Sequence, residues 1–138
     1  MEREKKEMIL SYIDRIGQAI EKTHRFVHDL SSFEEFQQNL EKQSAVKYEL
    51  LVGSESIQSI TKIDPNIEKE YPVIPWSEII GFRVALTHYH FKINLETVWE
   101  TAIKESYQLQ NQLASLQNHV LYYDKRLLQS RKNPNIPR

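Results

Sequence analysis

The sequence predicts an all-α fold: an antiparallel up-and-down bundle of four to five helices with a long C-terminal helix, assembled as a dimer. Apolar residues recur at steps of three and four along most of the chain, which is the spacing of a helix face. Only 3 Gly and 5 Pro occur among 138 residues, so few turns are expected. This length suits one domain. We expect residues 1–130 to form a single helical domain and residues 131–138 to form a disordered basic tail.

Composition limits the classes of partner. The formal net charge is -1, so nucleic acid cannot be attracted by a global positive field and would need a local patch. The chain has no cysteine, which excludes a disulfide framework and thiolate metal sites and fits a reducing cytosol. No stretch approaches the roughly 18 apolar residues of a membrane span, and the charged start does not resemble a signal peptide. We therefore expect a cytoplasmic protein with no membrane partner.

The first half of the chain contains three predicted helices. The first has one apolar face, made by Ile9, Ile13, Ile16, Ile20 and Val27. Ser32 and Glu35 have the spacing of a capping box and predict a short helix that ends near Leu40. A third helix is expected from about Ser44 to Ile60. Gly53 inside it costs roughly 1 kcal/mol relative to Ala, so we interpret it as a site where another helix packs closely.

The second half contains two predicted helices. Pro75 suits the first turn of a short, strongly apolar helix, and Asn94 can cap the last one. Residues of the last helix follow a four-three alternation: Leu95, Trp99, Ala102, Ser106, Leu109, Leu113, Leu116, Val120, Tyr123 and Leu127. This spacing fits a coiled-coil arm that reaches a partner chain and fits an ordinary bundle helix equally well.

Arg83 and His88, in the helix that follows Pro75, are the candidate catalytic residues. Arginine carries a permanent planar charge suited to phosphate, and histidine can give or take a proton near neutral pH. Metal-free cleavage of RNA needs a base, an acid and a cation of this kind. Five helical residues turn about 500°, so the two side chains stand roughly 140° apart. They converge if the helix loosens near His88 or if two chains of a symmetric dimer share one site.

A longer segment around these residues resembles a known family. Residues 74–83, His88 and residues 94–100 are similar to the HepT-like branch of the HEPN superfamily, toxins of the HEPN–MNT toxin–antitoxin systems. In outline the likeness extends from about Met8 to Leu116, and it is most specific from residue 74 to residue 100.

The resemblance implies a dimer whose paired arginine–histidine motifs line a cleft between the chains. Arg83 would be the phosphate-binding cation and His88 the acid–base group, without metal or cofactor. The function implied is an endo- or exoribonuclease toxin of a type VII-like HEPN–MNT module that cleaves RNA, with tRNA as one candidate. The partner implied is a small nucleotidyltransferase antitoxin, which transfers AMP to the tyrosine of the motif.

Two residues depart from the family pattern. Val84 stands where the family usually has asparagine, and it can neither bond to phosphate nor orient His88. His90 occupies the tyrosine position, and Tyr89 is its neighbour; both are candidate accessory residues. These departures favour an alternative, a catalytically weakened HEPN-like module that partners or regulates a nucleotidyltransferase. A structural coiled-coil adaptor is a third interpretation, and it rests on the last helix alone.

The predicted helix that contains Gly53 has two acids, Glu49 and Glu55. The family often has an acid directly after this glycine, whereas here Ser54 intervenes before Glu55. An acid facing the cleft could orient a histidine, so Glu55 is an accessory candidate. The other interpretation of Glu55, and of Glu49 on the same helix, is a solvated face.

His24 and His28 lie four residues apart, a spacing that can hold zinc. No third ligand is close to them in sequence, so we predict no metal site.

Overall fold

The computed structural model describes residues 2–89 and 92–132, and beyond Tyr122 it describes the backbone only. Regular structure in these ranges is entirely helical. The elements are α1 (Arg3–Val27), α2 (Phe33–Gln37), α3 (Leu40–Ile63), α4 (Ile67–Glu70), α5 (Trp76–His88), α6 (Leu95–Glu100), the π-helical turn η1 (Thr101–Glu105) and α7 (Ser106–Lys132). The predicted all-α class is therefore confirmed.

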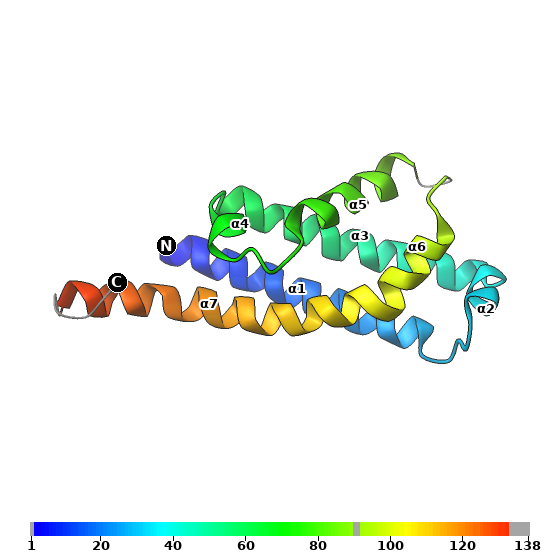
Figure 1. Cartoon of the computed structure of the whole chain (residues 1–138), viewed down its shortest axis with the longest axis horizontal. Helices are drawn as coiled ribbons and strands as arrows, with labels where there is room; N and C mark the ends of the chain where they lie inside the picture. Colours follow the sequence, from blue (N-terminus) through cyan, green and yellow to red (C-terminus); the bar gives the residue numbers. More distant parts are fainter. Residues whose placement is uncertain (1, 90–91, 133–138) are drawn as a thin grey trace.

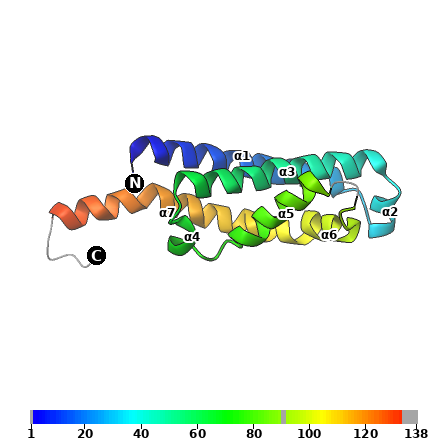
Figure 2. The ribbon, with the colours of Figure 1, turned by 90° about the horizontal axis from the view of Figure 1, so that it is seen from above.

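The long helices form an up-and-down bundle (Figure 1). α1 and α3 pack along their lengths and form its centre. α5 lies chiefly on α3, while α6, η1 and α7 run on as one helix that packs chiefly on α1. In both Figure 1 and Figure 2 the distal end of α7 projects past the other helices.

Two helix boundaries differ from the prediction. α2 ends at Gln37, and α3 already begins at Leu40 instead of Ser44. The cause is a cap that the apolar pattern did not reveal: the Asn39 side chain accepts the Lys42 N–H at 3.0 Å and starts a new helix there. α3 also continues to Ile63, past the expected end at Ile60.

The capping predictions have mixed outcomes. Ser32 caps α2 as expected and accepts the Glu35 N–H at 3.3 Å. The Glu35 carboxylate reaches back to the N–H of Ser31, at 2.7 Å, instead of that of Ser32. Asn94 caps α6 as predicted and accepts two backbone N–H groups, those of Glu96 at 2.8 Å and Thr97 at 3.2 Å.

The core consists of two clusters. The first joins α1, α3, α5 and α7 and contains Trp76, which is 3% exposed. The second lies near α2 and α6 and contains Phe36 and Trp99, whose ring centroids are 5.2 Å apart. Gly53 faces Ala19 of α1, but a Cβ at Gly53 would lie 3.8 Å from the Ala19 Cβ, an ordinary contact. Another helix therefore does pack on Gly53, as expected, although the space at this contact would also admit an alanine side chain.

The residues that form the four-three alternation of the last helix face the inside of the bundle. Its positions from Trp99 to Val120 are buried or half-buried in the bundle of the same chain, against the clusters just described. This confirms the bundle interpretation up to Val120. Tyr123 and Leu127 lie where only the backbone is described, so the coiled-coil interpretation of the distal part stays a prediction.

α7 reaches Lys132, and residues 133–138 of the expected tail lie outside the described residues. The boundaries of the predicted domain stay a prediction. Within the described ranges, none of the helices combines the length and the apolarity that crossing a membrane requires.

Candidate active site

α5 is anchored at its start and exposed along its flanks. Trp76 is buried, and its indole N–H donates to the Tyr71 carbonyl at 2.9 Å. Leu86 is the other buried residue of this helix. Since the remaining side chains of α5 are half-buried or exposed, the helix lies on the surface of the bundle and leaves its polar groups accessible.

Arg83 projects from α5 toward α3. Its side chain is 27% exposed, and its Nη2 lies 3.9 Å from Oε1 of Glu55. The two groups form an ion pair, but the distance between these atoms is too long for a hydrogen bond. The Nε of Arg83 is buried and has no hydrogen-bond partner among the described residues. The guanidinium is therefore held in place by Glu55 while its donors remain largely unused.

His88 is the last residue of α5, and its side chain is exposed. The N–H of Tyr89 donates to the Ala85 carbonyl at 2.9 Å, so the backbone is helical up to His88. The expected angle of roughly 140° between Arg83 and His88 therefore applies. No hydrogen bond or ion pair within the described part of the chain joins the two residues. One copy of the chain thus brings Glu55 to Arg83 but does not bring His88 to it.

The other motif residues are exposed or not described. Tyr89, the C-terminal cap of α5, has 59% of its surface exposed, and Val84 within the helix is 38% exposed. His90 lies outside the described residues. The exposure of Val84 means that it faces solvent at the position where the family usually has a polar group.

His24 and His28 have separate environments. The Nε2 of His24 lies 2.8 Å from Oγ of Ser106, and its ring stacks on Tyr107 at 3.5 Å between centroids. The Ser106 hydroxyl itself donates to the Ala102 carbonyl, so it accepts from His24, whose Nε2 carries the proton. His28 is exposed and its Nδ1 contacts the Arg25 carbonyl. Within the described residues, no three His, Cys, Asp or Glu side chains are grouped as a metal site.

The sequence did not reveal a cavity of about 360 Å³ between α5 and the α6–η1–α7 helix. Its floor is formed by α1 and α3, and Glu49 is one of its lining residues. Arg83 and His88 do not line it. Because Glu49 is only 8% exposed, its interpretation as part of a solvated face is wrong. One signal was available: Glu49 lies three residues after Val46 and four before Gly53, so it shares their helix face. The cavity itself depends on how α5 and α7 diverge, which no local pattern encodes.

These observations define a class of protein. The protein is an all-helical bundle in which an acid forms an ion pair with an arginine, and the same surface helix carries an exposed histidine. These are the groups that acid–base chemistry on phosphate esters uses.

Comparison with known proteins makes the class specific. Residues 16–116 match the family described as Ribonuclease HepT-like. A protein of Methanocaldococcus jannaschii, named as a candidate RNase, is 38% identical over 95 residues, which cover 68% of this chain and 72% of that protein. A protein of Thermococcus cleftensis, named as a candidate ribonuclease HepT, is 32% identical over 95 residues, 68% of this chain and 81% of its own. No solved structure gives a significant match. The chain belongs to the HepT-like ribonuclease family and is a ribonuclease-type HEPN protein.

Proposed function

We propose that two copies of this chain form a metal-independent ribonuclease site in which Arg83 binds phosphate and His88 transfers protons. The observation that carries the proposal is the state of Arg83. Its Nη2 is 3.9 Å from Glu55, its Nε has no partner among the described residues, and it shares a surface helix with the exposed His88. The buried Nε is out of reach of RNA, but the Nη groups make no hydrogen bond with the described residues and can hold a phosphate by a forked pair of hydrogen bonds. Membership of a ribonuclease family supports the same reading.

The reaction would be an internal transesterification. One His88 removes the proton of the ribose 2′-hydroxyl, and the 2′-oxygen forms a bond to phosphorus. A second His88 gives its proton to the 5′-oxygen as the bond from phosphorus to that oxygen breaks. Arg83 stabilises the negative charge that gathers on the phosphorane oxygens. The products are a 2′,3′-cyclic phosphate and a free 5′-hydroxyl, so no water or metal is consumed in this step.

The angle along α5 is the reason for invoking two chains. Within one helix, side chains roughly 140° apart do not meet at one phosphate. A symmetric dimer brings in a second α5 and therefore a second His88, one for each proton transfer. The half-exposed flanks of α5 leave surface for that contact.

The biological setting that we propose is a cytoplasmic toxin–antitoxin module with RNA, tRNA among the candidates, as the target. The partner would be a nucleotidyltransferase of the MNT type. Tyr89 is the candidate AMP acceptor on this chain, because its side chain is 59% exposed at the end of α5. Co-expression with such an enzyme, followed by mass spectrometry of the tryptic peptides, should find AMP on Tyr89 and none in Tyr89→Phe. AMP on another residue, or on none, contradicts this part of the proposal.

Cleavage is tested with the purified full chain and RNA in EDTA. Product ends should be cyclic phosphates, and Arg83→Ala and His88→Ala should each slow cleavage by about 10²-fold or more. His28→Ala, which removes an exposed histidine at the C-terminal cap of α1, is the matched control and should cleave at the wild-type rate. An unchanged rate in either site variant contradicts the site assignment.

A mixed dimer tests whether two chains share the site. Wild-type and His88→Ala chains with different tags are co-expressed, and the heterodimer is isolated through both tags. Residues that act as a unit are not additive, so one missing His88 should cost nearly as much as two. Retention of half the wild-type rate would mean that each chain acts alone.

An alternative is a weakened module that binds its partner without cleaving RNA. The exposed Val84 in place of a polar residue favours it. Absence of cleavage in the wild-type protein, together with stable binding of a nucleotidyltransferase, is the outcome that would establish this alternative.

A further inference from the structure

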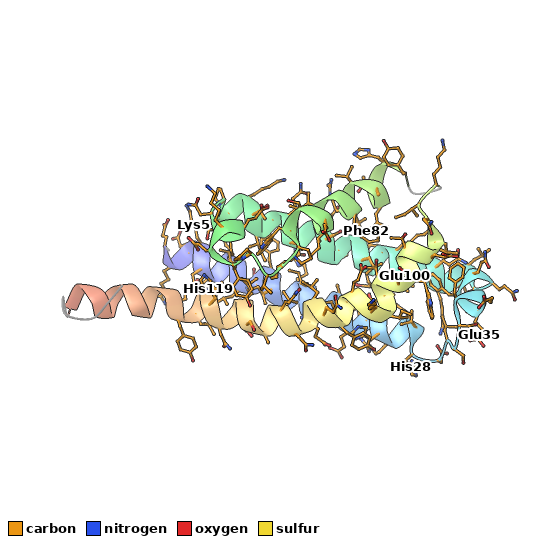
Figure 3. The ribbon with its side chains drawn as sticks, viewed as in Figure 1. Lys5, His28, Glu35, Phe82, Glu100 and His119 are labelled. Carbon is orange, nitrogen blue, oxygen red and sulfur yellow. The ribbon has the colours of Figure 1, made fainter. Side chains whose placement is uncertain are left out.

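The cavity between α5 and α7 is separate from the proposed ribonuclease site. It has a volume of about 360 Å³, within the range of small-molecule sites. Phe82, labelled in Figure 3, belongs to its α5 wall, and Ser106 and Leu109 belong to its α7 wall. Arg83, Glu55 and His88 are not among its lining residues.

Glu49 lines this cavity from α3. The residue is 8% exposed, and its carboxylate makes no hydrogen bond or ion pair with the described residues. A carboxylate at the edge of a cavity, with no cation of the described chain beside it, can pair with a cation that enters the cavity.

The charged residues of the lining are all acidic. Glu78 and Glu105 also line the cavity, and no Lys, Arg or His of the described chain does so. A ligand carrying negative charge would therefore be repelled, whereas a cation would be attracted from several sides.

Two hydroxyl groups in the lining can only accept from a ligand. The Thr101 hydroxyl donates to the Thr97 carbonyl at 2.7 Å, and the Ser54 hydroxyl donates to the Leu51 carbonyl at 3.1 Å. Each proton is used within its own helix, so only the oxygen lone pairs are left for a ligand. The complement of carboxylates and hydroxyl oxygens is a group rich in N–H donors.

The helix on the far wall is distorted at this level. η1 is a π-helical turn, and its first and last residues, Thr101 and Glu105, both line the cavity. Single π turns within α-helices occur frequently at functional sites. Thr101 and Glu105 lie four residues apart and therefore share one face of this helix.

We propose that the cavity binds a small organic cation with an ammonium or guanidinium head and an apolar stem. The head pairs with the Glu49 carboxylate and donates to the neighbouring oxygens. The stem lies against the apolar part of the lining, which includes Ile16, Leu50 and Phe82. This site is independent of RNA cleavage and of Arg83.

The test uses three probes with the same six-carbon stem: n-hexylamine, n-hexanol and hexanoate. Isothermal titration calorimetry on the full-length protein should show that hexylamine binds at least about tenfold more tightly than the other two. Glu49→Gln should weaken hexylamine binding by about tenfold or more and leave hexanol binding unchanged. Glu41→Gln, an exposed glutamate of the same helix outside the cavity, is the matched control and should bind hexylamine like the wild type.

Stability with ligand gives a second, independent readout. Because the amine head pairs with Glu49 of the folded chain, a given concentration of hexylamine should raise the urea midpoint of the wild type more than that of Glu49→Gln. Equal affinity for the three probes, or an equal rise of the midpoint in both proteins, overturns the proposal. A different result also overturns it. If hexylamine does not bind the wild type and sedimentation shows that Glu49→Gln weakens a dimer, the cavity holds a side chain of a second copy of the chain. None of these measurements uses RNA, so they test the cation site separately from the ribonuclease assignment.

Discussion

The Nη2 of Arg83 lies 3.9 Å from Oε1 of Glu55, which joins α5 to the helix on which it rests. At this separation the acid restricts where the guanidinium can point but does not take up its hydrogen bonds. With half of the Glu55 side chain in water, the pair itself contributes little to folding. Its effect is expected on the geometry of phosphate binding.

Glu55→Gln tests this positioning role. It should lower kcat of RNA cleavage about two- to fivefold with little change in KM, and it should change the free energy of unfolding by less than about 1 kcal/mol. Steady-state kinetics with a short RNA and urea unfolding measure the two effects, with Glu41→Gln as the control on α3. A rise in cleavage would contradict the prediction, because Glu55 would then compete with the substrate for Arg83.

Val84→Asn should restore a polar group beside Arg83. Because Val84 is 38% exposed and the two residues have similar helix propensities, the free energy of unfolding should stay within about 0.5 kcal/mol. The initial rate of RNA cleavage should rise. Val73→Asn, at a 55% exposed position before α5, should leave the rate unchanged. An equal rate for Val84→Asn would mean that the valine does not limit catalysis.

Phe36→Ala should be strongly destabilising. The ring is fully buried and packs on Trp99, so its loss should cost about 3–5 kcal/mol, a large part of the stability of a domain this size. Urea unfolding followed by circular dichroism measures the loss. Leu40→Ala removes an apolar side chain that is 75% exposed near the same helices and should cost less than about 0.5 kcal/mol. Similar costs for both variants would contradict the assignment of Phe36 to the core.

His24 should make the fold sensitive to mild acid. Burial lowers the pKa of His24 below its ordinary value of 6.5, so the unfolded chain binds a proton more readily than the folded one. Its contribution to stability is therefore complete above pH 6.5 and is lost as the pH falls from there toward the lowered pKa. Urea midpoints measured from pH 8 to pH 5 should fall with pH in the wild type, as about one proton is taken up.

Two variants separate this effect from general acid sensitivity. His24→Gln should flatten the pH dependence of the midpoint, whereas the exposed His28→Gln should keep the wild-type slope. A slope that is unchanged in His24→Gln would assign the sensitivity to other groups.

Local features of this fold were predictable from the sequence. The Asn94 cap, the start of α2 after Ser32 and the buried face of α1 each depend on residues within a few positions of one another. The apolar alternation of the last helix located that helix correctly. It could not say whether the apolar face meets its own bundle or another chain, because both partners require the same spacing.

Contacts between distant parts of the chain were harder to predict from the sequence. Glu55 was a candidate beside a solvated-face alternative, and only the packing of α5 on α3 brings it to Arg83. The burial of Glu49 depends on four helices that meet around one cavity. Such relationships arise from crossing angles and helix ends, which hydrophobic periodicity does not specify.

The chain's two tryptophans lie in different parts of the core, Trp76 in the cluster that joins α5 to α1 and α7, and Trp99 in the cluster around Phe36. The protein therefore carries one tryptophan in each half of its interior. Replacing either indole with phenylalanine leaves a single tryptophan, and when excitation avoids the tyrosines its spectrum follows the hydration of that half alone. Loosening that begins at the α2 end can thus be distinguished in time from loosening that begins beneath α5, without attaching any label.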